Sequence, residues 1–176
     1  GPGNTLMDAW IGQHQRKPYD EGGKWAAEGE VIHELLEALL ADPYFFKPNP
    51  KSTGPEYFDL DWLAGSLTGL ESPGDVQRTL AELTVESIAG ALEARDYQVV
   101  RICGGGARND LLMERLSARL RPRVVTSTAA IGVDPEWVEA WAFAWLAEQT
   151  LDGQPGNIAS VTGAAGERGL GAIYPA

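Results

Sequence analysis

One junction in the chain reads Tyr97-Gln98-Val99-Val100-Arg101-Ile102-Cys103-Gly104-Gly105-Gly106-Ala107-Arg108-Asn109. It joins a short apolar, β-branched segment to a run with helical spacing of apolar residues, Asp110 to Leu120. The three glycines have no Cβ, so a ligand can come close to their main chain. A helix that starts at Asn109 or Asp110 has free N–H groups, which favour an anion. The pattern predicts a strand, a tight glycine turn and a helix, with a nucleotide phosphate as the natural ligand.

The turn by itself does not distinguish a binding site from a structural turn. It lacks the Gly-Lys-Ser/Thr of a Walker loop, and it does not have Gly-x-Gly-x-x-Gly spacing. Consecutive glycines also mark ordinary turns between a strand and a helix. A phosphate site and a turn that binds nothing therefore remain equal alternatives at this point, and the rest of the sequence has to separate them.

Composition and charge narrow the class of protein. The chain has 176 residues, of which 44% are hydrophobic and 22% charged, as is typical of one folded domain. Its formal net charge of −11 argues against nucleic acid or an anionic membrane as a general partner. The segment from Arg101 to Arg123 nevertheless holds six Arg residues against two acidic residues, which favours a phosphate site nearby. Within it, Arg115 and Arg119 are expected on a solvated helix face.

Cysteine and histidine usage excludes several kinds of site. Cys103 is the only cysteine, so no intrachain disulfide can form and a reducing compartment is expected. At the end of an apolar strand, Cys103 is expected to be a small buried side chain. His14 and His33 have no partner at metal-motif spacing, so we expect no metal site built from protein side chains. The chain shows no membrane-spanning run and no secretory signal, and a cytoplasmic location is expected.

Apolar periodicity predicts the remaining elements. We expect helices over residues 6–14, 31–40, 58–67, 75–95 and 134–146, a second strand over 123–126, and a last strand or docked loop over 170–174. Residues 43–55 contain four prolines and are expected to be irregular. The tryptophans of the last helix form an apolar stripe, which is typical of a core. Helices that alternate with strands indicate an α/β layered domain.

Several of these segments together resemble one family, the 1,6-anhydro-N-acetylmuramic acid kinases of bacterial cell-wall recycling. The resemblance runs through the whole chain in order, and Pro55 departs from the polar or basic residue that the family more often has. The matching segments are Gly1–Asn4 with Leu6–Asp8, Lys17–Asp20, Trp25–Ala26, Pro50–Gly54 with Glu56, Asp75–Leu80, Cys103–Asn109, Gly132–Asp134, Glu139–Ala140 with Phe143–Ala147, Val161–Gly163 and Leu170–Pro175.

The resemblance implies the α/β fold of the actin, Hsp70 and sugar-kinase (ribonuclease H-like) superfamily, in which two lobes close over ATP and helices pack on a mixed sheet. It implies that residues 1–176 are the C-terminal lobe alone, because the family's Gly-Thr-Ser-x-Asp-Gly phosphate segment belongs to the first lobe. Gly1 matches the third residue of the family motif Asp-Thr-Gly-Pro-Gly-Asn. The catalytic Asp is therefore expected just upstream of Gly1, and no catalytic residue is expected within the chain.

In that family, the Asp takes a proton from the water that attacks the anomeric carbon. The departing bridge oxygen receives the γ-phosphoryl group of ATP, Mg²⁺ neutralises charge, and the products are N-acetylmuramic acid 6-phosphate and ADP. This chemistry relies on positioning and electrostatics, and so requires both lobes. By the resemblance, the nucleotide contacts in this lobe are Gly104, Gly105, Gly106 and Asn109. The residues beside the missing base, at the interlobe cleft, are Gly3 and Asn4. Weaker candidates for nucleotide or sugar contacts are Lys51, Ser52, Thr53 and Glu139. Glu139 fits a carboxylate on a helix surface equally well.

The sequence leaves three hypotheses. The leading one is the C-terminal lobe of an ATP-dependent anhydro-sugar kinase, inactive without its first lobe, with a small-molecule sugar as substrate and a homodimer surface on its amphipathic helices. The alternative is a free-standing half-kinase that binds nucleotide or regulates without catalysis. The third is a structural α/β domain whose glycine turn binds nothing, which predicts that nucleotide leaves its stability unchanged.

Overall fold

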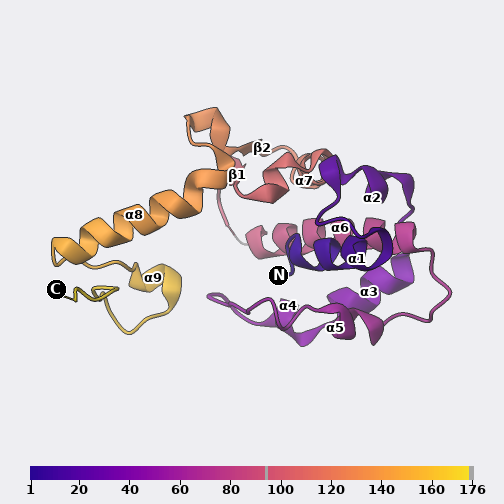
Figure 1. Ribbon diagram of the computed structural model, residues 1–176, viewed down its shortest axis with the longest axis horizontal. Coiled ribbons are helices and arrows are strands. Elements are labelled where there is room, and N and C mark those ends of the chain that lie inside the picture. Colours follow the sequence, from indigo (N-terminus) through magenta and orange to yellow (C-terminus); the bar gives the residue numbers. More distant parts are fainter. Residues whose placement is uncertain (94, 175–176) are drawn as a thin grey trace.

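A computed structural model describes residues 1–93 and 95–174 of the chain. Its helices and strands form a layered body, from which one long helix and the C-terminal tail extend (Figure 1). In chain order, with η for a 3₁₀ helix, the elements are α1 (Thr5–Gln15), η1 (Glu21–Gly23), α2 (Lys24–Glu28), α3 (His33–Leu40), α4 (Pro43–Phe46), α5 (Leu60–Ala64), α6 (Pro73–Leu92), β1 (Val99–Ile102), η2 (Gly105–Arg108), α7 (Asp110–Arg119), β2 (Val124–Ser127), η3 (Thr128–Ile131), η4 (Pro135–Trp137), α8 (Val138–Leu151) and α9 (Ala159–Thr162).

The central element of the body is α6, which packs against α1, α2, α3 and α7 (Figure 1). It begins with a proline at its first position, where the missing N–H costs no helical hydrogen bond. Leu80 and Leu83 of α6 are buried in one cluster with Leu6 of α1 and Leu39 of α3. Each such buried leucine contributes roughly 1.5–3 kcal/mol, so α6 fixes the position of the helices that carry the site.

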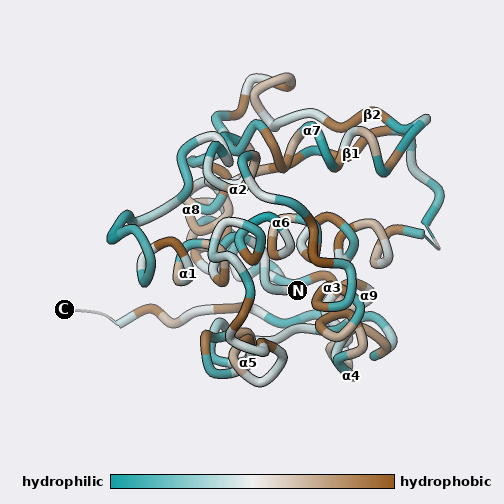
Figure 2. Tube along the Cα trace, turned by 90° about the vertical axis from the view of Figure 1, so that its right-hand side faces the viewer, coloured by the Kyte–Doolittle hydropathy of each residue, from teal (hydrophilic) through white to brown (hydrophobic). Residues whose placement is uncertain are grey.

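Within the described residues the sheet has two parallel strands, β1 and β2, which are connected through α7. Val100, Ile102 and Val125 pack against the buried side chains of α6 and α7. Val99 pairs with Val124 in the register, and these two side chains point to the opposite face because strand residues alternate. They are 37% and 57% exposed. Hydrophobic residues run through both strands (Figure 2), yet one sheet face is left open by the described residues.

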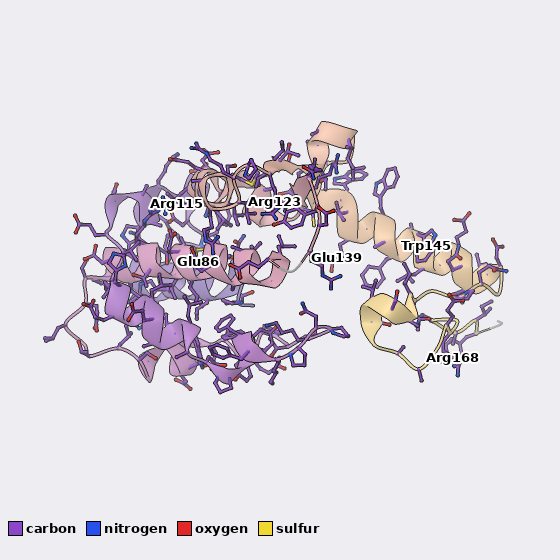
Figure 3. The ribbon with its side chains drawn as sticks, turned by 180° about the vertical axis from the view of Figure 1, so that it is seen from behind. Glu86, Arg115, Arg123, Glu139, Trp145 and Arg168 are labelled. Carbon is purple, nitrogen blue, oxygen red and sulfur yellow. The ribbon has the colours of Figure 1, made fainter. Side chains whose placement is uncertain are left out.

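The long helix that leaves the body is α8. None of its residues is buried, and α9 and the tail fold back beside it (Figures 1 and 3). Trp141 and Trp145 in α8 and Trp137 just before it are 62%, 46% and 62% exposed. The expectation that this aromatic stripe forms core is wrong for these residues, because no described segment covers them.

Two arginines of α7 form ion pairs with α6. Arg115 donates from Nε and Nη2 to the two carboxylate oxygens of Glu82 on α6, at 3.0 and 2.9 Å. Arg119 donates to Glu86 at 2.8 Å, one turn further along both helices. Both arginine side chains stay partly solvated, as expected, at 39% and 38% exposure, and in addition they form an ion-paired seam between α6 and α7.

Most element boundaries agree with the sequence pattern within a few residues. The helix expected from residue 31 begins at His33, and the helix expected to reach Arg95 ends at Leu92, while Ala94 lies outside the described residues. Residues 43–46, expected to be irregular, form α4, because Asp42 accepts the Tyr44 N–H at 2.8 Å. That short helix shows that a proline-rich loop can still contain one well-capped turn.

The sheet and its surroundings hold the larger differences. The expected mixed sheet is purely parallel in the described part of the chain. Residues 170–174 form no strand and take the other expected form, a docked loop, in which the Leu170 carbonyl accepts a hydrogen bond from Thr150 of α8. Pro175, the end of one segment that matches the family, lies outside the described residues. Cys103 is exposed instead of buried, because it follows β1 at the uncovered side of the sheet. Across 1–93 and 95–174, no helix has the length and apolar character needed to cross a membrane.

Candidate functional site

The glycine turn between β1 and α7 has the structure that its sequence predicts. Gly104 has a φ of 71°, a conformation that residues with a Cβ rarely adopt, and its N–H donates to the Pro135 carbonyl at 2.8 Å. Asn109 is the N-cap of α7, and its Oδ1 accepts the Leu112 N–H at 3.0 Å. The predicted cap is confirmed, and the start of α7 is firmly set beside the turn.

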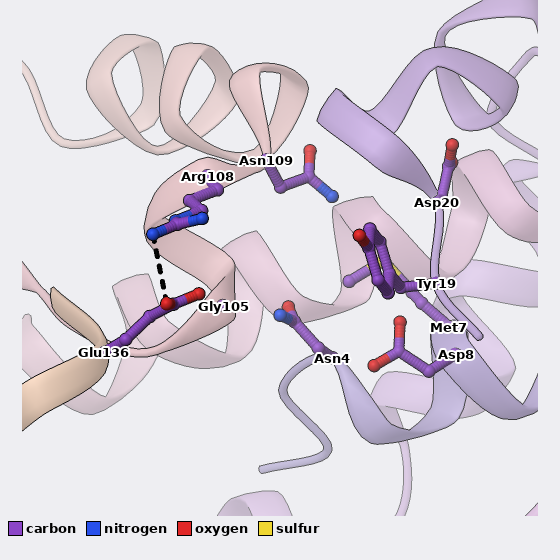
Figure 4. A pocket seen from close by; sticks show the side chains of 9 residues that line it. All are labelled: Asn4, Met7, Asp8, Tyr19, Asp20, Gly105, Arg108, Asn109 and Glu136. Atoms are coloured by element: carbon purple, nitrogen blue, oxygen red, sulfur yellow. Dashed lines mark ion pairs between the residues drawn. The ribbon is translucent and has the colours of Figure 1, made fainter. Parts of the chain in front are cut away.

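A pocket of about 270 Å³ opens between this turn, the start of α1 and the loop before η1 (Figure 4). It brings together three predicted site residues that are far apart in sequence, Asn4, Gly105 and Asn109. The full lining is Asn4, Met7, Asp8, Tyr19, Asp20, Gly105, Arg108, Asn109 and Glu136.

Asn4 lies against the glycine turn. A Cβ placed on Gly106 would be 3.4 Å from Asn4 Oδ1, and one placed on Gly105 would be 3.7 Å from Asn4 Nδ2. Gly3 precedes Asn4 with a φ of 57°, and its carbonyl accepts a hydrogen bond from Thr84 Oγ1 of α6 at 3.0 Å. The motif segment Gly3–Asn4 is thus anchored on the central helix and held next to the exposed main chain of the turn.

Two carboxylates line the pocket wall opposite the turn, and they have different tasks. Asp20 is buried and accepts the N–H groups of Trp25 and Ala26, both at 2.9 Å, so it fixes the start of α2. Asp8 is half-buried, and burial, followed by the nearby Asp20 carboxylate, raises the pKa of Asp8 from 3.8 to about 6. Asp8 is therefore the pocket residue whose charge changes in the weakly acidic range.

The remaining polar wall is formed by Arg108 and Glu136, whose Nη2 and Oε2 atoms lie 3.0 Å apart (Figure 4). Both side chains are largely exposed, so this ion pair contributes less than about 1 kcal/mol. The Arg108–Glu136 ion pair connects η2 to η4. A ligand that displaces this ion pair loses little free energy by doing so. In Figure 4 the amide nitrogen of Asn109 is directed into the pocket. Hydrogen-bond donors therefore lie on the side of the pocket that the glycine turn forms.

The weaker candidates lie elsewhere. Lys51 donates to the carbonyls of Phe45 and Tyr44, at 2.7 and 3.3 Å, so it closes the end of α4. Ser52 is exposed, and Thr53 bonds only to the next carbonyl, at 3.4 Å. Glu139 is exposed on α8 (Figure 3) and does not line the pocket. The structure brings none of these four residues into the pocket.

Sequence reasoning missed the other six residues of the pocket lining: Met7, Asp8, Tyr19, Asp20, Arg108 and Glu136. Asp8 had a usable signal, because it follows Asn4 by four positions in a helix and so shares its face. Tyr19 and Asp20 belong to a segment that matches the family, and Arg108 lies within the glycine junction. Glu136 had no such signal, since the Asp134-Pro135 pair indicated only where a helix begins.

Metal-ligating side chains do not converge in the part of the chain that the structure describes. In 1–93 and 95–174, no group of three or more His, Cys, Asp or Glu side chains is placed to hold a metal ion. The His14 ring packs on Trp10 with ring centroids 4.1 Å apart. Polar atoms gather instead in the pocket at the glycine turn, which makes this pocket the best candidate for binding a small molecule.

Comparison with known proteins identifies the family. The family model for anhydro-N-acetylmuramic acid kinase matches residues 1–176. Proteins of that name are 54% identical in Thiobacillus denitrificans, 53% in Nitrosospira multiformis and 51% in Coxiella burnetii. The matches cover 99–100% of this chain but only 48–49% of each relative. The chain belongs to the anhydro-N-acetylmuramic acid kinase family, and it spans about half the length of these curated relatives.

Proposed function

We propose that this chain is the C-terminal lobe of an ATP-dependent kinase that opens 1,6-anhydro-N-acetylmuramic acid with water and phosphorylates it to N-acetylmuramic acid 6-phosphate. Family membership over the whole chain supports the reaction class. The observation that carries the proposal is that Asn4 lies beside the Gly105–Gly106 turn in one pocket. It joins the segment expected beside the catalytic base to the segment expected at the nucleotide.

The pocket suits the phosphate end of a nucleotide. Backbone N–H groups at the start of α7 and the turn favour an anion, and a side chain at Gly105 would project toward Asn4 into the space that the ligand needs. Magnesium prefers a few carboxylates plus phosphate oxygens and water. Since the described residues form no metal cluster, the ion fits best as part of the Mg·ATP ligand, where it supplies charge neutralisation.

The lobe is not expected to turn over the sugar alone. By the family resemblance, the general base belongs to the motif residue two positions ahead of the one that Gly1 matches, so residues 1–176 do not include it. What the chain contributes is binding and orientation, in that the glycine turn and Asn109 hold the nucleotide while Gly3 and Asn4 shape the cleft. A second lobe is needed to exclude water and complete the site.

The experiment is a calorimetric titration with Mg·ADP and Mg·ATP, made on the chain alone and on the chain joined to the part of a relative that it lacks. Gly105→Val should raise the dissociation constant at least tenfold, because it fills the pocket. Its new Cβ meets Asn4 at an ordinary contact distance of 3.7 Å, so the melting temperature should change little.

Gly90→Ala is the matched control, because nothing lies within 4 Å of a Cβ at that helical position. It should leave nucleotide affinity unchanged and stabilise the protein by up to about 1 kcal/mol. If the joined protein bound neither nucleotide, or if Gly105→Val bound both normally, the phosphate assignment would be wrong. If the joined protein bound Mg·ATP but formed no sugar phosphate, the kinase assignment would fail while the nucleotide site stood.

A further inference from the structure

The pocket at the glycine turn holds two neighbouring carboxylates in different surroundings. Asp20 accepts the Trp25 and Ala26 N–H groups, one on each carboxylate oxygen, both at 2.9 Å. The Asp8 carboxyl is half-buried, and the causes that raise its pKa are burial and the Asp20 charge, with no hydrogen bond and no cation among them. In the described part of the chain, an ionised Asp8 is therefore a charge without compensation.

The charged groups around α1 are engaged with one another. On the pocket wall, Arg108 pairs with Glu136 at 3.0 Å, and Tyr19 is the remaining titratable side chain besides the two aspartates. The elements that pack most closely on α1 are α6 and α5, and their charged side chains are Asp75, Arg78, Glu82, Glu86 and Asp61. Arg78, the cation of this set, lies 3.8 Å from Glu82. A ligand that enters beside Asp8 thus meets a carboxyl group whose charge these neighbours do not offset.

The small size of the pocket brings a bound anion close to this carboxyl group. The volume of about 270 Å³ is at the lower end of the range for ligand sites, and Asn4 and Asp8 both line it from α1 and the residue before it (Figure 4). A further negative charge nearby disfavours the ionised form of a carboxyl group. The neutral form has an O–H donor, which an anionic oxygen can accept.

We propose that Asp8 binds the ligand as a neutral carboxyl group, donating its O–H to an anionic oxygen, so that the ligand and one proton enter the pocket together. This inference rests on the proposed function for its ligand, a nucleotide whose phosphate lies at the glycine turn. Asp8 is then a further binding residue, supplied from α1 opposite the donors of the turn and Asn109.

The proton makes the affinity depend on pH in one direction. The pKa of Asp8 in the ligand-free folded chain is about 6, so most Asp8 carboxyls are ionised at pH 7 and take up a proton when the ligand binds. Proton and ligand then favour each other's binding, and the affinity falls as pH rises. We expect an uptake of at least about half a proton per nucleotide at pH 7, and a dissociation constant roughly five- to tenfold higher at pH 8 than at pH 6.5.

The experiment is a calorimetric titration with Mg·ADP at pH 7 in three buffers of different ionisation enthalpy, because the slope of the binding enthalpy against the buffer enthalpy counts the protons taken up. It is made on the chain joined to the part of the Thiobacillus denitrificans relative that it does not match, and on the chain alone. Asp8→Asn keeps a donor in its amide group but cannot take up a proton. In this variant the uptake should fall by at least about half a proton per nucleotide, and the loss of affinity between pH 6.5 and 8 should disappear.

Glu136→Gln is the matched control, because it removes from the same pocket a carboxylate that is largely exposed and paired with Arg108. It should keep the proton uptake and the pH dependence of the unsubstituted protein. Any proton that Mg·ADP itself exchanges is common to all three proteins, so the differences between them belong to the protein. Circular dichroism of each free variant verifies that the chain is folded.

The possible outcomes separate this inference from the proposed function. Loss of uptake in Asp8→Asn, with retention in Glu136→Gln, supports the role of Asp8. Nucleotide binding without proton uptake, or with equal uptake in all three proteins, overturns that role and leaves the nucleotide site standing. Equal loss in both variants also overturns it, because the effect then belongs to the overall negative charge of the pocket. If Mg·ADP binds to neither form of the protein, the proposed function fails and this inference fails with it.

Discussion

Asp8 links the pocket to pH. Its pKa is raised to about 6 in the folded protein, by burial first and by Asp20 second, whereas an unfolded chain has the ordinary value near 3.8. The folded state therefore binds more protons than the unfolded state between these values, and stability falls as pH rises through this window. The difference corresponds to about 3 kcal/mol, and because Asp8 is only half-buried, solvent screening reduces the expected effect to about 1 kcal/mol.

Asp8→Asn should therefore raise the free energy of unfolding at pH 7.5 by about 1 kcal/mol. It should also flatten the dependence of that free energy on pH between 4 and 6.5, as measured by urea unfolding at a series of pH values. Asp96→Asn, at an exposed position, is the control and should leave the profile unchanged. An Asp8→Asn profile with the same slope as the unsubstituted protein would contradict the electrostatic role given to Asp8.

At the scale of elements, the seam between α6 and α7 contains two similar ion pairs in different surroundings. The Glu82 side chain is 9% exposed, and its partner Arg115 makes a two-bond contact with it. Arg78 also lies 3.8 Å from Glu82. The side chains of Glu86 and Arg119 are 27% and 38% exposed. Removing the partner of a buried charge costs far more than breaking an exposed pair.

Arg115→Ala should lower the free energy of unfolding by about 2 kcal/mol, since Arg78 still offsets part of the Glu82 charge. Arg119→Ala, one turn away on the same helix, should cost about 0.5 kcal/mol. Urea unfolding of both variants at pH 7 measures the difference. Equal costs would show that the burial of Glu82 does not set the strength of the seam.

The elements themselves follow closely from sequence pattern. The period of apolar residues in α6 and α7 locates both helices, and Asn109 and Asp134 cap the turns where their types predict. The apolar periodicity of a sequence does not show whether the surface that covers an apolar face belongs to the same chain. The α8 stripe was therefore expected to be core, and Cys103 to be buried, although both are exposed.

The lining of the pocket likewise contains residues that motifs predict and residues that only the fold brings in. Asn4, Gly105 and Asn109 were predicted from their motifs, and the fold brings them together. Asp8 lies near Asn4 through its spacing of four along α1. Glu136 comes close only because η4 packs against η2, which no local spacing encodes. Lys51 was a reasonable candidate as a lysine in a proline-rich loop, but its ammonium group satisfies the carbonyl ends of α4.

For the whole molecule, the exposure of α8 predicts that the same substitution has different costs in this chain alone and in the chain joined to the part of a relative that it does not match. Trp141→Ala should change the stability of this chain alone by less than about 0.5 kcal/mol, because the side chain is 62% exposed. In the joined protein, where we expect α8 to be enclosed, the cost should be about 3 kcal/mol.

Thermal and urea unfolding of both forms measure this difference. Trp10→Ala is the control, because Trp10 is 8% exposed and donates to the Pro73 carbonyl at 2.9 Å. It should destabilise both forms by about 3 kcal/mol or more. A Trp141→Ala cost that is equally small in both forms would show that α8 stays uncovered in the longer protein.

Cys103 is the single thiol of the chain, it is exposed, and the glycine turn begins at the next residue. A maleimide dye therefore attaches at one known place without any engineering of the sequence. Since the label would sit beside the pocket, its emission gives an optical sensor for ligands at the turn. The chain thus offers two fluorescence signals, one from the dye for ligand binding in the pocket and one from tryptophan for the burial of α8.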